Sequence, residues 1–89
     1  MKESYECSFN INPERTIEKG LQTRPYLKSN PSGMTTYETF STTLPDTRIK
    51  ISLDYSSKKG RIDIISKDEG VTKKDIREKI IEKELHNIL

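Results

Sequence analysis

Cysteine and histidine, two residue types that commonly carry catalysis or bind metals, are scarce in this sequence. Cys7 is the only cysteine, His86 is the only histidine, and tryptophan is absent. Transition-metal sites need clusters of histidine, cysteine or carboxylate at ligand spacing, so we expect no bound metal. A single histidine close to the C-terminus does not indicate a Ser-His-Asp triad. One cysteine also excludes a disulfide within the chain and is typical of a reducing compartment.

Glycine clusters and long apolar stretches are lacking as well. The four glycines are isolated, whereas a phosphate-binding loop needs several of them at close spacing. No stretch approaches the roughly 18 apolar residues of a membrane span. Residues 1–5 lack the apolar run of a signal peptide. We therefore expect no cofactor, no enzyme activity, no membrane insertion and a cytoplasmic location.

Charge of one sign is also lacking, because 16 basic and 14 acidic residues leave a net charge of +2. A charge balance this close to neutral does not by itself select nucleic acid as a partner. Hydrophobic residues make up only 30% of the chain, but the near-zero net charge removes the repulsion that disordered chains usually have. We expect residues 1–89 to form one small folded domain.

Alternating polarity predicts a strand near the start of the chain. Polar residues there alternate with an apolar set made of Tyr5, Cys7, Phe9 and Ile11. This period of two is typical of a strand with one buried face. We place the Cys7 thiol in the core because a free cysteine behaves as a small hydrophobe.

A short helix and a long loop are predicted next. Asn12 can act as the N-cap, with proline at the first helical position. Ile17 and Leu21, four residues apart, provide a thin apolar stripe. Residues 22–33 contain two prolines, two serines, an asparagine and a glycine without periodicity, which is typical of a loop. The threonines and aromatic residues that follow favour a second strand.

The clearest strand pattern lies at residues 49–64, where two alternating apolar series flank a polar turn and predict a β-hairpin. We predict the register that places Asp54 opposite Arg61 and leaves residues 56–59 as the loop, with a glycine for the positive φ angle. The alternative register sets Asp54 against Asp63, and such a like-charge pair destabilises a hairpin.

A capping box and an apolar series predict the last helix. Thr72, with Asp75 three residues on, resembles a capping box. At 100° per residue Ile76 and Ile80 face the sheet, whereas a second apolar group projects away from them by about 100° or more. We expect this second group to contact a protein partner or a second copy; it consists of Ile81, Leu85 and Ile88. The alternative is that the first strand and the proline-containing loop cover it within the chain.

These elements predict an α+β fold. Its small antiparallel sheet has the order β-α-β-β-β-α, with a short N-terminal helix and a longer C-terminal helix packed on it. The predicted core consists of Cys7, Phe9, Ile11, Ile17, Ile49, Ile51, Leu53, Ile62, Ile64, Ile76 and Ile80.

Basic side chains gather around the hairpin and the start of the last helix. A two-stranded ribbon can enter a major groove, and lysines at a helix start can hold phosphates. Interleaved acidic residues instead favour a solvated strand face that resists aggregation. The residues of this nucleic-acid alternative are Arg48, Lys50, Lys58, Lys59, Arg61, Lys73, Lys74 and Arg77.

One segment resembles a known family. Residues 70–77, continuing to Leu85, are similar to the last helix of double-stranded-RNA-binding domains, and the order of one helix, three strands and one helix after residue 12 is similar too. The resemblance implies phosphate contacts by Lys73 and Lys74. The first strand is foreign to that family. The small alanines that the family has in its last helix are replaced here by Ile76, Ile80, Ile81 and Glu84.

Two functional hypotheses follow. The first is a non-enzymatic protein-binding module, for instance a small regulator or inhibitor of a larger bacterial or phage machine, which acts on a protein partner or as a homodimer. Its support is small size, mixed charge and the wide apolar arc of the last helix. The alternative is a nucleic-acid-binding domain that uses the basic hairpin and the start of the last helix. An affinity that falls steeply with salt would favour this alternative.

Overall fold

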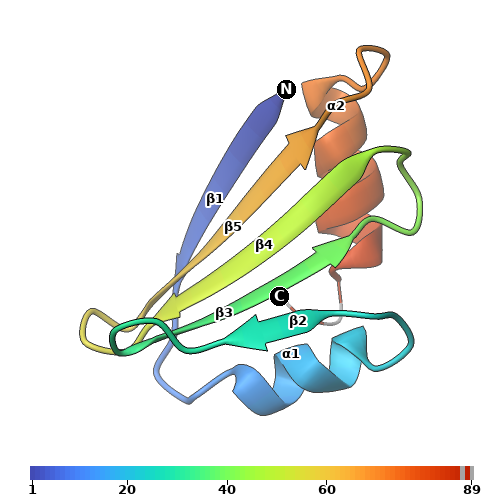
Figure 1. Ribbon diagram of the computed structural model, residues 1–89. Coiled ribbons are helices and arrows are strands. Elements are labelled where there is room, and N and C mark those ends of the chain that lie inside the picture. The colour runs from blue at the N-terminus through green and yellow to red at the C-terminus, as the bar shows by residue number, and fades with distance from the viewer. Residues whose placement is uncertain (87, 89) are drawn as a thin grey trace.

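The computed structural model describes residues 1–86 and residue 88, which form a five-stranded antiparallel sheet with helices on one face (Figure 1). The strands are β1 (Lys2–Ser8), β2 (Leu27–Ser29), β3 (Met34–Phe40), β4 (Thr47–Asp54) and β5 (Lys59–Ser66). The helices are α1 (Glu14–Leu21), α2 (Lys73–Asp75) and η1 (Ile76–Glu84), which continues α2. The predicted α+β class is confirmed, and the short strand β2 is an addition to the predicted order.

The strand order is β1-β5-β4-β3-β2. Strands β3, β4 and β5 therefore form an antiparallel meander, and β1 joins it beside β5. In β4 the side chains of Ile49, Ile51 and Leu53 are buried, whereas those of Arg48 and Lys50 are exposed. This alternation places the core on one face of the sheet and leaves the opposite face uncovered, because successive side chains of a strand point to opposite faces.

The core lies between the covered face and the helices. Eight of the predicted core residues are buried: Ile17, Ile49, Ile51, Leu53, Ile62, Ile64, Ile76 and Ile80. They are joined by Leu21, Tyr37, Leu44, Val71 and Leu85. Phe9 is only partly buried and packs against this cluster.

Two residues of the first strand do not enter the core, so their predicted burial is wrong. Cys7 is exposed, and Ile11 is 84% exposed in the bend between β1 and α1. Strand β1 ends at Ser8, before the alternation in the sequence ends. It also forms the margin of the sheet, where the helices cover less of the surface. Cys7 lies opposite Gly60 of β5. A Cβ atom at position 60 would lie 3.1 Å from the Cys7 Sγ.

The β4–β5 hairpin has a different register from the predicted one. Asp54 lies opposite Lys59 rather than Arg61, so the predicted register is wrong, and the like-charge alternative is not formed either. The turn begins earlier in the sequence than predicted. The reason is that the Asp54 carboxylate accepts hydrogen bonds from the Ser56 backbone N–H at 3.1 Å and from the Ser56 hydroxyl at 2.8 Å. The positive φ angle of the turn, +55°, belongs to Lys58 and not to a glycine.

The last helix begins as predicted and then departs from α-helical geometry. The Thr72 hydroxyl accepts a hydrogen bond from the Asp75 N–H, and the Asp75 carboxylate accepts one from the Thr72 N–H, both at 3.1 Å. The capping box is therefore confirmed. From Ile76 the chain adopts π-helical spacing, in which hydrogen bonds join residues five apart. The Leu85 N–H accordingly bonds to the Ile80 carbonyl at 2.7 Å.

Candidate functional site

A buried carboxylate joins three segments of the chain. The Glu84 side chain is 1% exposed and forms an ion pair with Arg24, which is 11% exposed. Glu84 also accepts hydrogen bonds from the Ser41 hydroxyl at 2.8 Å, the Thr42 N–H at 2.8 Å and the Thr43 hydroxyl at 2.9 Å. Burial acts to raise the pKa of Glu84, but these bonds outweigh it and hold the pKa below its usual value. This network ties η1 to the loop after β3, so its role is structural.

A second polar cluster fastens α1 to the sheet. It consists of Glu14, Glu18, Lys28, Tyr37 and Tyr55. The Lys28 ammonium lies 3.1 Å from Glu14 and 2.9 Å from Glu18. Tyr37 donates its hydroxyl to Glu18 at 2.7 Å, and Tyr55 donates to Glu14. The hydrogen bond from Tyr55, followed by those from Asn12 and Lys28, lowers the pKa of Glu14 to about 2. Because each charged group of the cluster has a partner within it, the cluster also has a structural role.

The lowered pKa of Glu14 predicts an acid-dependent loss of stability. A carboxylate whose pKa is lower in the folded state stabilises the fold above its unfolded-state pKa, here about 4.5, and this contribution disappears as the pH falls through about 2. Urea unfolding of the wild type and of Glu14→Gln should therefore differ at pH 7 and converge near pH 2. Tyr55→Phe should shrink the difference by removing the largest cause of the shift. A constant difference between pH 7 and pH 2 would contradict this assignment.

Other groups that carry chemistry are sparse in the part of the chain that the structure describes. Among these residues, no three His, Cys, Asp or Glu side chains gather closely enough to hold a metal ion. Over residues 1–86 and 88, no helix has both the length and the apolar character needed to cross a membrane. The remaining candidate for function is the surface that the helices leave uncovered.

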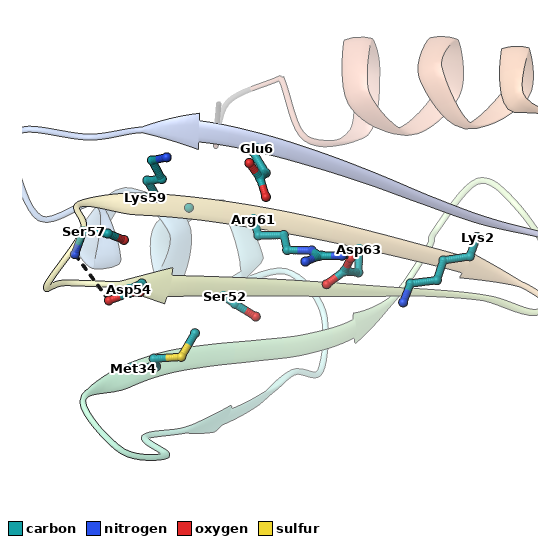
Figure 2. A pocket seen from close by; sticks show the side chains of 10 residues that line it. Lys2, Glu6, Met34, Ser52, Asp54, Ser57, Lys59, Arg61 and Asp63 are labelled. Atoms are coloured by element: carbon teal, nitrogen blue, oxygen red, sulfur yellow. Dashed lines mark hydrogen bonds and ion pairs between the residues drawn. The ribbon is translucent and has the colours of Figure 1, made fainter.

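The middle of the uncovered face is polar. A shallow hollow of about 500 Å³ lies there. Its lining consists mainly of charged and polar side chains of β1, β4 and β5 (Figure 2). The Arg61 guanidinium turns toward Asp63, with Nε 2.9 Å from the carboxylate. The Arg48 guanidinium lies 3.5 Å from Glu38. Basic side chains of this face are thus interleaved with acidic ones, which limits the positive field that the face can present.

One corner of the same face is apolar. Leu27, Phe40 and Ile65 are 72%, 66% and 40% exposed. The strand register places Phe40 and Ile65 on either side of Arg48, and Leu27 lies on the next row, opposite Glu38. Phe40 and Arg48 border two hollows of about 170 and 270 Å³, one beside Leu27 and the other beside Ile65. We call Leu27, Phe40, Arg48 and Ile65 the Phe40 corner.

The basic residues of the nucleic-acid alternative fall into separate groups. Those on the uncovered face or in the hairpin turn are Arg48, Lys50, Lys58, Lys59 and Arg61. The others, Lys73, Lys74 and Arg77, belong to α2 and η1, which pack on the opposite face. Lys73 lies 3.6 Å from Glu3. The structure does not bring the two groups together on one surface.

The second apolar group of the last helix does not project into solvent. Leu85 is completely buried within its own chain, and Ile81 and Ile88 are partly buried and pack against the core. The predicted exposure of Leu85 is wrong because π-helical spacing places residues five apart, such as Ile80 and Leu85, on one face. Partner binding by Ile81, Leu85 and Ile88 stays a prediction, and it would require the helix to leave the core.

Comparison of the chain with protein-family models, with curated proteins and with solved structures finds no match. The resemblance to double-stranded-RNA-binding domains therefore rests on the residues of the last helix and on the order of the elements. The structure departs from the implied three-stranded sheet by adding β1 and β2 at its two margins. The candidate site is accordingly defined by the chain's own surface, which is the uncovered face with its Phe40 corner.

Proposed function

We propose that this chain is a small non-enzymatic protein-binding module, and that it regulates or inhibits a larger protein assembly through the uncovered face of its sheet. The observation that carries the proposal is the exposure of Phe40 beside Leu27 and Ile65. Leaving a large apolar side chain in water forgoes roughly 1.5–3 kcal/mol of burial free energy. Aromatic residues are also enriched in protein interfaces.

The surroundings of Phe40 support a protein as the partner. The two hollows that border Phe40 can receive side chains of a binding partner. The charged residues around them form the polar rim that is typical of interfaces. The two buried or half-buried polar clusters, around Glu84 and Glu14, are engaged in structural contacts, which supports a binding role over a catalytic one.

The nucleic-acid alternative has weaker support. Two arginines that would contact phosphates, Arg48 and Arg61, already contact Glu38 and Asp63. A binding face with acidic residues between the basic ones repels the phosphate backbone as well as attracting it. We expect partner affinity to change little with salt, because few counterions are released without phosphate contacts.

Phe40→Ser is expected to weaken partner binding by at least roughly tenfold, because truncating an aromatic anchor at the centre of an interface has effects of this size. The tagged chain is used to capture proteins from cells of its source, with and without nuclease. The captured protein is identified by mass spectrometry, purified and titrated against each variant.

Ile11→Ser is the matched control, since Ile11 is more exposed than Phe40 but lies outside the sheet. It should bind like the wild type, and both variants should keep the wild-type melting temperature. Equal binding by Phe40→Ser and Ile11→Ser would contradict the role of the Phe40 corner. Loss of capture after nuclease treatment would point to nucleic acid instead.

A further inference from the structure

The margin of the sheet at β1 carries unused backbone hydrogen-bonding groups. The Met1 amine donates to the Ser66 carbonyl and the Ser66 N–H donates to the Met1 carbonyl, both at 2.8 Å. In an antiparallel ladder every second residue makes such a reciprocal pair. The β1 residues that alternate with these bonded ones therefore direct their N–H and C=O groups away from β5. They are Lys2, Ser4, Glu6 and Ser8. Figure 1 shows β1 at the edge of the sheet, and among the described residues no further strand lies beside it.

The two margins of the sheet differ in how they resist pairing with another strand. Strand β2 has three residues and lies between Pro25 and Pro31, and proline and short length both block strand addition. Strand β1 has seven residues, contains no proline or glycine, and pairs with β5 without a bulge. Only the β1 margin is therefore long and regular enough to accept another strand.

We propose that two copies of this chain pair antiparallel through β1, centred on Ser4, so that their two five-stranded sheets join into one. This register uses the outward groups of Lys2, Ser4 and Glu6 and forms about six backbone hydrogen bonds. It sets Lys2 directly opposite Glu6 of the second copy, and the two-fold symmetry repeats this pair. Opposite charges in directly facing positions stabilise a strand pair.

Charge complementarity selects this register over its neighbours. Pairing centred on Tyr5 would set Glu6 against Ser4, and pairing centred on Glu6 would set two Glu6 carboxylates against each other. Within the part of the chain that the structure describes, no ion pair engages Lys2 or Glu6. The guanidinium of Arg61, which lies opposite Glu6 in the sheet, turns to Asp63 instead (Figure 2). Both residues are exposed. Figure 2 shows their side chains directed over the uncovered face, so in the dimer they would turn toward the β1 margin.

This pairing does not rest on the proposed function, because it uses the β1 margin and leaves the Phe40 corner free. The molar mass of the full chain, under reducing conditions, is measured by sedimentation equilibrium from about 1 μM to about 1 mM. The wild type should form a dimer within this range. Lys2→Glu and Glu6→Lys should each weaken dimerisation by at least roughly tenfold, since each replaces both attractive pairs by like-charge pairs.

The double variant, with Lys2→Glu and Glu6→Lys together, restores opposite charges and should recover the wild-type dimerisation constant. A merely disruptive effect of the single substitutions would not be reversed in this way. A wild type that stays monomeric at every concentration would overturn the proposal, and so would a double variant as weak as the single ones. Phe40→Ser should dimerise normally, so failure of the pairing and failure of the proposed function are distinguishable.

Disulfide trapping tests the register independently. Residues in a reciprocally bonded antiparallel pair have Cα atoms about 5.5 Å apart, within the range of about 4.4–6.8 Å that a disulfide spans. In a Cys7→Ser background, Ser4→Cys should therefore form a crosslinked dimer on mild oxidation. Ser8→Cys, the same substitution on the same margin, should crosslink at least roughly tenfold more slowly. Equal rates at the two positions, or faster trapping of Tyr5→Cys, would overturn the Ser4-centred register.

Discussion

Replacement of Glu84 by alanine is expected to lower the free energy of unfolding by about 3–5 kcal/mol, because it leaves the largely buried Arg24 guanidinium without its counter-charge. The same change removes the acceptor for Ser41, Thr42 and Thr43. Small domains have a total stability of about 5–15 kcal/mol. The variant should therefore be largely unfolded or melt at a much lower temperature, as measured by circular dichroism and urea titration.

Glu82→Ala is the control for this prediction, since Glu82 is exposed on the same helix and exposed substitutions usually change stability by less than about 0.5 kcal/mol. In the double variant, Arg24→Ala with Glu84→Ala, the free energy of unfolding should fall by less than the sum of the two single decreases, because both partners are then absent. Equal melting temperatures for Glu84→Ala and Glu82→Ala would contradict the structural role of the carboxylate.

Ile51→Ala is expected to lower the free energy of unfolding by about 2–5 kcal/mol, the usual range for truncating a buried isoleucine. Ile51 lies in the central strand β4, opposite Tyr37 on one side and Ile62 on the other, and its side chain is buried. This loss is a large share of the stability of a domain of this size.

Ile65→Ala provides the matched comparison, since it removes the same atoms from the opposite face of the neighbouring strand, where the side chain is 40% exposed. It should lower the stability much less than Ile51→Ala does in the same urea titration. Similar losses at the two positions would contradict the assignment of the covered and uncovered faces.

Local patterns in the sequence were sufficient to predict the strands of the hairpin and the start of the last helix. The alternation of Ile49, Ile51 and Leu53 with polar residues predicted β4 and its buried face, because alternate side chains of any strand point to opposite faces. Thr72 and Asp75 predicted the start of α2 for a similarly local reason. A capping box requires only two residues three positions apart, and both of its hydrogen bonds are present.

Part of the candidate site also had a signal in the sequence. Ile65 directly follows Ile64, so burial of one places the other on the opposite face of β5. Tyr37 and Phe40 are separated by three positions, an odd number, so they also point to opposite faces of their strand. Their gathering into one corner depends on β3 and β5 lying on either side of β4, and no local pattern specifies that strand order.

Other features were decided only by the tertiary structure. Cys7 has the spacing of a buried residue but is exposed, because β1 became the margin of the sheet. Leu85 is buried because the helix adopted π spacing. Glu84 only interrupts an apolar series in the sequence, yet it meets Arg24, 60 positions away, in the folded chain. Periodicity determines which side chains share a face of one element. Whether that face meets solvent, a helix or an opposite charge depends on packing between segments distant in the sequence.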